Sequence, residues 1–208
     1  MKQQSPREEL FNSALHGLGA LAAIAGLFVL LYRQTDSWKI SSFSIFCGTM
    51  FLLYTTSSLY HATTNGRIKR IIKKLDHLAI YLLIAGTYAP FTLVLLRDSW
   101  GWQAFSAAWI LALCGIIYDL LPRQNDGRAV PVTIYLLMGW MALLLAKPLL
   151  EQLSPAGFAW LFCGGLSYTF GLIFYALDER VPYFHAVWHL FVLAGSFFHY
   201  LAVLLYIA

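Results

Sequence analysis

Charged residues are scarce in this sequence: Asp, Glu, Lys and Arg make up 12% of its 208 residues, whereas 60% are hydrophobic. A soluble domain carries about 25% charged residues. The stretches without any of these four residue types are 10–32, 40–66, 77–96, 99–118, 129–146, 152–177 and 181–208. Each can supply the roughly 17–25 residues that a helix needs to cross the hydrocarbon core of a bilayer. Because these stretches use almost the whole chain, no soluble domain is expected.

Paired cysteines and strand-like alternation are also lacking. Cys47, Cys114 and Cys163 each stand alone in an apolar stretch, without a CxxC spacing, so neither a disulfide nor a thiolate metal site is expected. The alternation of apolar and polar residues that is typical of membrane-barrel strands is absent. The first apolar stretch is followed by Arg33 and a second stretch rather than by a cleavage site. It is therefore interpreted as a retained helix and not as a signal peptide.

These observations predict an all-α membrane protein, a bundle of seven transmembrane helices in a single domain that covers residues 1–208. Helices are expected because a backbone in lipid must satisfy its own hydrogen bonds. The connections are short, so neighbouring helices are expected to run antiparallel. The expected spans are 13–32, 40–61, 76–96, 101–120, 130–147, 156–177 and 184–206.

The basic residues predict a cytoplasmic N-terminus and a C-terminus outside. With seven spans in this orientation, the inside segments hold Lys2, Arg7, Arg67, Lys69, Arg70, Lys73, Lys74, Arg123, Arg128 and Arg180. The outside segments hold Arg33, Lys39, Arg97 and Lys147. Cytoplasmic loops of membrane proteins are enriched in Lys and Arg, so this orientation is favoured. The net charge of +4 is thus a topology signal and does not indicate nucleic-acid binding.

The longest charged loop, 67–75, has Ile68, Ile71, Ile72 and Leu75 at helical spacing with basic residues between them. This pattern describes a short helix that lies on the inner leaflet and is attracted by anionic headgroups. An ordinary positively charged cytoplasmic loop explains the same residues equally well.

Topology places five polar residues of distant segments at one depth. Odd spans run outward and even spans run inward, so the second span ends inside, at Ser57 and His61. The third span begins inside at Asp76, and the seventh begins inside at His185 and His189. Ionisable groups are costly inside a membrane and usually have a function. We therefore expect a site just within the cytoplasmic edge of the bilayer.

The three histidines of this layer fit a metal site, with Zn²⁺ as the expected cofactor. His185 and His189 are four residues apart, on one face of a helix, and His61 comes from another helix. Catalytic zinc commonly has three protein ligands and an open position for water. Asp76 could accept a hydrogen bond from that water or from an imidazole. Ser57, one turn before His61, could orient the water or a substrate carbonyl.

Each of these signals also has another explanation. A single histidine in a membrane helix can serve packing or a proton relay, and an HxxxH pair often arises by chance. His16 is interpreted as an interface residue or as an outer group of the site. His199 lies about 15 Å beyond His189 along its helix and is interpreted as a separate packing or hydrogen-bonding residue. Imidazole ligands also suit metal ions other than zinc.

Several motifs follow one another along the chain: Glu9-x-x-Asn12-x-x-x-His16-x-x-Gly19, Ser57-x-x-x-His61, Asp76 in Leu-Asp-His-Leu-Ala-Ile-Tyr, the segment 78–90, and His185-x-x-x-His189. Together they resemble the hemolysin III family, the bacterial branch of the progestin and adipoQ receptor group, which includes the adiponectin receptors. The likeness covers essentially the whole chain, and the ordered set is far more specific than any single motif.

The resemblance implies seven helices, a cytoplasmic N-terminus and a zinc site near the inner face of a bacterial inner membrane. It implies that His61, His185 and His189 are the zinc ligands, and that Asp76 and Ser57 lie beside the metal-bound water. It also implies hydrolysis of a lipid amide, which has been proposed for the receptors because they look like relatives of alkaline ceramidases. The long N-terminal extension of the receptors is lacking here, so hormone binding is not expected.

The leading expectation is a zinc-dependent membrane hydrolase that acts on a lipid amide or ester and takes part in membrane homeostasis. The alternative is a non-enzymatic sensor or regulator of membrane state, with a structural zinc site. A haemolysin-like pore former finds little support because the chain has no ring of charges, and bis-histidine haem binding is a further option. The expected partners are membrane lipids, including a lipid substrate, with no nucleic acid and no protein partner.

Overall fold

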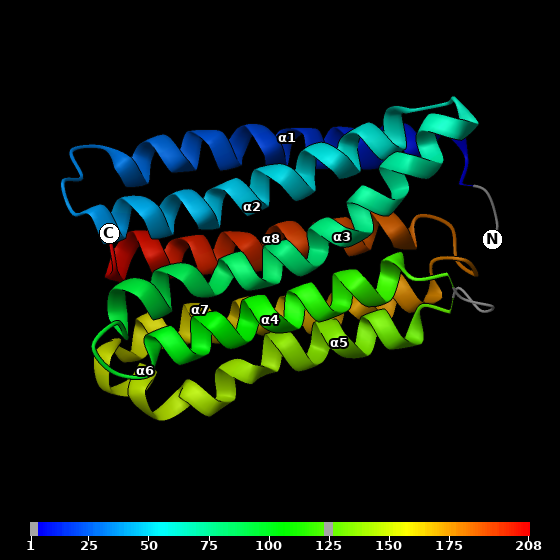
Figure 1. Cartoon of the computed structure of the whole chain (residues 1–208). Helices are drawn as coiled ribbons and strands as arrows, with labels where there is room; N and C mark the ends of the chain where they lie inside the picture. The colour runs from blue at the N-terminus through cyan, green and yellow to red at the C-terminus, as the bar shows by residue number, and fades with distance from the viewer. Residues whose placement is uncertain (1–3, 123–126) are drawn as a thin grey trace.

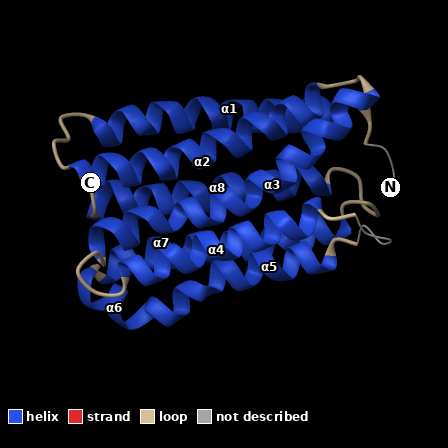
Figure 2. Ribbon diagram, in the orientation of Figure 1, coloured by secondary structure: helices blue, strands red, loops and turns tan. Residues whose placement is uncertain are grey.

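The computed structural model describes residues 4–122 and 127–208, and every regular element in this part of the chain is helical (Figure 2). The α-helices are α1 (Pro6–Leu31), α2 (Ser37–Ala62), α3 (Gly66–Pro90), α4 (Gly101–Leu120), α5 (Ala129–Trp140), α6 (Ala146–Gln152), α7 (Pro155–Leu177) and α8 (Phe184–Tyr206). A π-helical segment, η1 (Phe91–Leu95), extends α3, and a 3₁₀ segment, η2 (Met141–Leu145), joins α5 to α6. The predicted all-α class is confirmed.

Seven segments of the described chain are long and apolar enough to span a membrane. They are α1, α2, α3 with η1, α4, the run from α5 through η2 to α6, α7, and α8. This confirms the seven-helix prediction. The first and the third spans begin earlier than the expected ranges, at Pro6 and Gly66, and the fifth ends later, at Gln152.

The helices form one bundle in which segments distant in sequence lie side by side (Figure 1). α1, α2 and α3 pack in chain order, while α8 lies against both α1 and α7. α1 begins at one end of the bundle and α8 ends at the other (Figure 1). The end at which α1 begins also holds the starts of α3 and α8 and the end of α2. We expect this end to be cytoplasmic from the distribution of basic residues, of which Lys2 and Arg123 lie outside the described residues.

Two helices begin earlier than expected because each has a strong N-cap. Ser5 and Glu8 form a capping box at the start of α1, in which each side chain accepts a hydrogen bond from the backbone N–H of the other residue. The side chain of Asn65 accepts two backbone N–H groups at the start of α3. The segment 67–75 is therefore neither a separate surface helix nor a loop, but the first turns of α3.

Breaks in the helical pattern occur in the third and fifth spans. Pro90 has no backbone N–H to continue the α-helical pattern, and the chain goes on from it as the π-helical η1. In the fifth span, the hydroxyl of Tyr88 donates to the carbonyls of Met138 (2.6 Å) and Gly139 (3.1 Å), just before η2. A carbonyl at membrane depth needs a partner within the protein. The tyrosine therefore stabilises the break.

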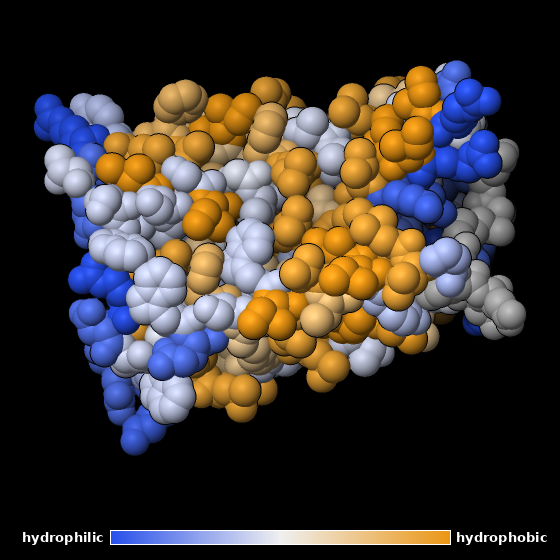
Figure 3. Space-filling view, viewed as in Figure 1, coloured by the Kyte–Doolittle hydropathy of each residue, from blue (hydrophilic) through white to orange (hydrophobic). Residues whose placement is uncertain are grey.

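On the face that Figure 3 shows, the bundle is mostly apolar in its middle and hydrophilic at both ends. Large apolar side chains are exposed on several helices, among them Leu18, Leu21, Phe28, Leu113 and Leu144. Soluble monomers rarely expose continuous apolar surface of this extent. Such a band matches the hydrocarbon layer of a bilayer, and the chain is accordingly a multi-pass membrane protein.

Candidate metal centre

Three imidazoles meet at the end of the bundle where α2 ends and α8 begins. His61 lies in the last turn of α2, and His185 and His189 lie in the first two turns of α8. One ring nitrogen of each lies within 4.8 Å of the others, a grouping that could hold a metal ion. His61 and His189 are buried and His185 is half-buried. These residues, called the histidine cluster below, come from segments more than a hundred residues apart.

The start of α8 is held in place by α1. Tyr183, directly before α8, adopts a left-handed backbone conformation with φ of 64°. Its N–H donates a 2.6 Å hydrogen bond to a carboxylate oxygen of Glu8, in the first turn of α1. Positive φ is uncommon for a residue other than glycine. The contact with Glu8 helps to stabilise this turn and so positions His185 two residues later.

A carboxylate from α1 orients the ring of His61. The Nδ1 atom of His61 lies 2.7 Å from Oε2 of Glu9, and the other oxygen of Glu9 binds Nζ of Lys69 at 2.8 Å. Because a carboxylate accepts hydrogen bonds, Nδ1 carries the hydrogen and Nε2 presents its lone pair. A hydrogen bond of this kind is the usual support of a metal-binding histidine.

A second carboxylate orients the ring of His185 in the same way. Nδ1 of His185 lies 2.7 Å from Oδ2 of Asp178, and Nη1 of Arg128 donates to Oδ1 of Asp178 at 2.7 Å. Burial by itself raises the pKa of Asp178, but the hydrogen bonds from His185 and Arg128 outweigh it and hold the pKa below its usual range. Asp178 therefore stays charged.

Neither Asp178 nor Arg128 was anticipated as part of the site from sequence. Asp178 is the first charged residue after the stretch 152–177, and it stands seven residues before His185. That position gave a weak signal, because a charge directly after a span is usual in membrane proteins. Its contact with the cluster depends on the tight turn between α7 and α8.

The histidine cluster fits a metal ion by the chemistry of its ring nitrogens that have no hydrogen-bond partner. Among the described residues, Nε2 of His61 and Nε2 of His185 are buried without a hydrogen-bond partner. A buried acceptor without a donor is unfavourable. Neutral imidazole nitrogens whose opposite N–H is held by a carboxylate are the donors that zinc prefers. The geometry thus provides two oriented ligands, with His189 beside them.

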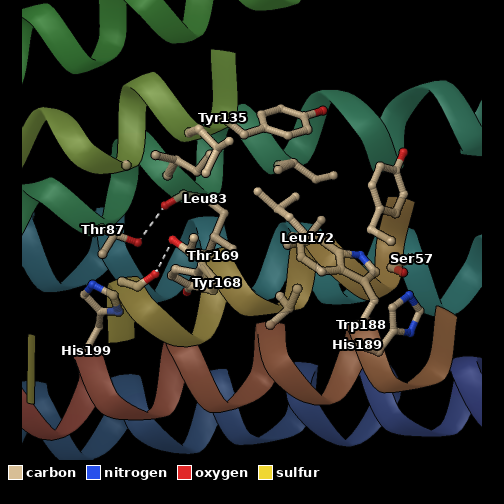
Figure 4. A pocket seen from close by; sticks show the side chains of 18 of the residues that line it. Ser57, Leu83, Thr87, Tyr135, Tyr168, Thr169, Leu172, Trp188, His189 and His199 are labelled. Carbon is tan, nitrogen blue, oxygen red and sulfur yellow. Dashed lines mark hydrogen bonds between the residues drawn. The ribbon is translucent and has the colours of Figure 1, made fainter. Parts of the chain in front are cut away.

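Asp76 and Ser57 line the same cavity as His185 and His189 of the histidine cluster. Both side chains are buried. Ser57 lies one turn before His61 on α2, whereas Asp76 belongs to α3. Figure 4 shows Ser57 beside His189 at one end of the cavity. The structure therefore brings the three histidines together, and Ser57 and Asp76 line the same cavity as two of them do.

The three remaining motif residues lie on α1 around the cluster. Glu9 supports His61, as described above. Asn12 is fully buried, and its amide donates to Oε1 of Gln4 at 2.9 Å. The ring of His16 stacks on that of His189, with a centroid distance of 3.7 Å and an interplanar angle of 13°. Stacking places His16 in a parallel plane, so it supports the ring of His189 and does not join the group of three.

A single cavity of about 360 Å³ extends from the cluster into the bundle. Its polar end contains His189 and Ser57, and its other end contains His199 (Figure 4). Leu172 and Tyr135 lie between them, among mostly apolar side chains. The volume is within the range of about 300–1,000 Å³ that is typical of small-molecule sites.

The apolar helices and the buried cluster at one end define a multi-pass membrane protein with a candidate metal centre. The chain belongs to the Haemolysin-III related family, whose model matches residues 4–200. It is similar to "Hemolysin-3" of Bacillus cereus, with 40% identity over 207 residues that cover 98% of this chain and 94% of that protein. The "Hemolysin-3 homolog" of Bacillus subtilis (strain 168) is 41% identical over 203 residues, which cover 96% and 94%.

The wider likeness to receptors is also found. The "Adiponectin receptor protein" of Drosophila melanogaster is 26% identical over 227 residues, which cover 92% of this chain and 49% of that protein. The resemblance inferred from the ordered motifs is thus confirmed. An inner-membrane location in a bacterium is consistent with the seven spans and with the two bacterial relatives.

Proposed function

We propose that the protein is a zinc-dependent hydrolase that cleaves an amide or ester bond of a membrane lipid. The observation that carries this proposal is the position of the histidine cluster. Two of its histidines line one end of a long, mostly apolar cavity that is also lined by the buried carboxylate of Asp76 and the buried hydroxyl of Ser57. Three imidazoles that can hold a metal ion, an acid–base residue and an apolar pocket are the groups that a metal-dependent lipid hydrolase uses.

His61, His185 and His189 would hold the zinc ion, and Glu9 and Asp178 would orient the first two rings. When bound, zinc polarises a carbonyl and lowers the pKa of water to about 7. The three rings supply neutral nitrogen donors, so the charge of the metal is not cancelled by its protein ligands.

Asp76 is suited to act as the general base and then as the general acid. Its carboxylate would accept a proton from the attacking water as the water oxygen bonds to the carbonyl carbon. It would return that proton to the leaving nitrogen or oxygen as the bond to carbon breaks, which yields a carboxylic acid and an amine or alcohol. Ser57, which lines the same cavity as Asp76, would keep the carboxylate and the water in line. General acid–base catalysis of this kind contributes typically 10²–10⁴-fold.

The cavity supports a lipid as the substrate. Its walls beyond the cluster are mostly apolar, so an acyl chain can leave water there while its carbonyl stays near the histidines. A zinc ion that only fastened α2 to α8 would need no such space. The cavity therefore favours hydrolysis over the alternative of a purely structural metal site in a membrane sensor.

The test combines metal analysis with turnover of ceramides and phospholipids by the purified protein. We expect about one zinc ion per chain and release of fatty acid from at least one lipid class. Asp76→Asn should keep the metal and lose about 10²–10⁴-fold in turnover. His189→Ala should lose both metal and turnover, whereas His77→Ala, next to Asp76 but outside the group of three, should keep its metal. Full turnover in His189→Ala, or a metal-free wild type, would contradict the proposal.

A further inference from the structure

The cavity ends at a second group of polar side chains, far from the histidine cluster. Leu83 and Leu172 line its middle, and His199, Thr87 and Thr169 lie together at its far end (Figure 4). His199 is 6% exposed. Polar groups at this depth of a membrane protein are unfavourable unless they have partners. An apolar cavity built only for hydrocarbon would not need them.

The far end lies near the middle of the membrane. His199 follows His189 by ten residues on α8, which corresponds to about 15 Å at a rise of 1.5 Å per residue. This is about half of the roughly 30 Å hydrocarbon core. An acyl chain whose carbonyl lies at the histidine cluster, as in the proposed function, would therefore bring its distal carbons to His199.

The imidazole of His199 offers a hydrogen-bond acceptor. Its Nδ1 lies 2.7 Å from the carbonyl oxygen of Gly195, and a carbonyl only accepts, so Nδ1 carries the hydrogen and Nε2 presents a lone pair. Gly164 makes room for the ring, since a side chain at that position would collide with it. The ring of Tyr168 stacks on the imidazole at 5.4 Å, and its hydroxyl is engaged with Ser196 at 2.8 Å.

The two threonine hydroxyls at this end already donate their hydrogens to backbone carbonyls. Thr87 donates to the carbonyl of Leu83 at 2.8 Å, and Thr169 donates to the carbonyl of Gly165 at 2.8 Å, as Figure 4 shows. Thr169 also accepts a hydrogen bond from Nε1 of Trp140 at 3.1 Å. What both hydroxyls can still offer a ligand is an oxygen lone pair. Like His199, they therefore select a ligand that donates.

We propose that Nε2 of His199 accepts a hydrogen bond from a hydroxyl group on the distal part of a lipid acyl chain, at the end of the cavity that Thr87 and Thr169 also line. An ether, ketone or ester oxygen at the same place has no hydrogen to donate and would face lone pairs. The proposal takes from the proposed function only that the acyl carbonyl lies at the histidine cluster. It makes the far end a specificity site for hydroxylated chains, whether or not the bond at the other end is cleaved.

The test measures binding with three ligands that differ only at the chain end: ω-hydroxylauric acid, ω-methoxylauric acid and lauric acid. The extended lauroyl chain matches the separation of the two ends of the cavity. Each ligand displaces a fluorescent fatty acid from the purified full-length protein, with zinc present and after chelation. We expect the hydroxylated chain to bind about tenfold more tightly than the other two. A tenfold difference in affinity corresponds to about 1.4 kcal/mol, which one buried hydrogen bond can provide.

The variant His199→Phe keeps a ring at this position and removes the acceptor, so the preference for the hydroxyl should fall markedly. Equal affinity for the three ligands in the wild type, or no displacement by any of them, would overturn the proposal. An unchanged preference in His199→Phe would do so as well. If the protein prefers the hydroxylated chain but shows no turnover, only the proposed hydrolysis is refuted. Turnover without the preference would refute only the distal site.

Discussion

Asp178 and His185 stand on either side of the turn between α7 and α8, and their side chains are joined by a 2.7 Å hydrogen bond. Asp178 caps the end of α7, whereas His185 lies in the first turn of α8. The orientation of one candidate ligand is thus set by the shape of this turn. Arg128, from the start of the fifth span, holds the other oxygen of Asp178 and ties a third segment to the same ring.

Replacing Asp178 by Asn should weaken metal binding. The amide keeps the shape of the side chain but loses the charge that makes the imidazole a better donor to a metal. Changes to such supporting groups typically cost 10–100-fold in metal affinity. Competition with a zinc chelator measures the loss. Glu179→Gln is the matched control, since Glu179 also pairs with Arg128, at 3.2 Å, without touching the cluster. Equal affinity of Asp178→Asn and wild type would refute the supporting role.

Glu9, which lies on α1, should support the imidazole of His61 as Asp178 supports that of His185. Glu9→Gln is expected to lower zinc affinity about tenfold, because Oε2 of Glu9 holds Nδ1 of His61 at 2.7 Å. Lys69→Gln serves as the control, as it removes the 2.8 Å ion pair on the other oxygen of Glu9 and a cation–π contact with Tyr60, and leaves the Glu9–His61 hydrogen bond in place. Chelator competition reads out both variants. A loss in Lys69→Gln as large as that in Glu9→Gln would contradict a specific role of the Glu9–His61 hydrogen bond.

Metal removal should lower the thermal stability of the protein. The cluster joins α2 to α8, so an ion bound there stabilises only the folded bundle. The gain is about 4.1 kcal/mol when the free metal exceeds its dissociation constant about 1,000-fold. We expect the melting temperature to fall on chelation and to recover when zinc is added back. His61→Ala should melt at the same temperature with and without zinc, and a zinc-dependent shift in that variant would place the stabilising ion elsewhere.

Gly115 should be essential for packing α4 against α3. A side chain there would collide with the ring of Tyr81, which is held by a 3.0 Å hydrogen bond from its hydroxyl to Asp119. Gly115→Ala is therefore expected to destabilise the fold by about 1–3 kcal/mol, as overpacking usually does. Gly48→Ala is the control because nothing lies within 4 Å of an added methyl group at that position. Thermal unfolding measures the stability of both variants. Equal stability of Gly115→Ala and Gly48→Ala would contradict the prediction.

The candidate site could be predicted in outline because depth in a membrane follows from chain topology. His61 and the His185/His189 pair were placed in one layer by counting spans, and the structure brings them within 4.8 Å of each other. The motif around Glu9 pointed to the same layer. The individual contact of Glu9 with His61 could not be foreseen, because it depends on how α1 and α2 are rotated about their axes.

The start of α3 shows where the local sequence pattern was insufficient. In the segment 67–75, apolar residues recur at helical spacing with basic residues between them. Both a surface helix and a loop were compatible with this pattern. The side chain of Asn65 caps the segment, and the helix then continues without interruption to Pro90. Whether an amphipathic segment stays separate or joins the next span depends on its direction relative to the bundle, which the spacing of its residues does not specify.

By itself the sequence determined the number of membrane-spanning segments and the layer of the three histidines, because the hydrocarbon core demands long uncharged stretches and short loops force the chain to alternate direction. Only the tertiary structure decided which carboxylate meets which imidazole, that Asp178 belongs to the site, and that the cavity ends at His199. These features depend on the lateral order and the rotation of the helices, and both are set by side-chain packing between segments that are far apart in the chain.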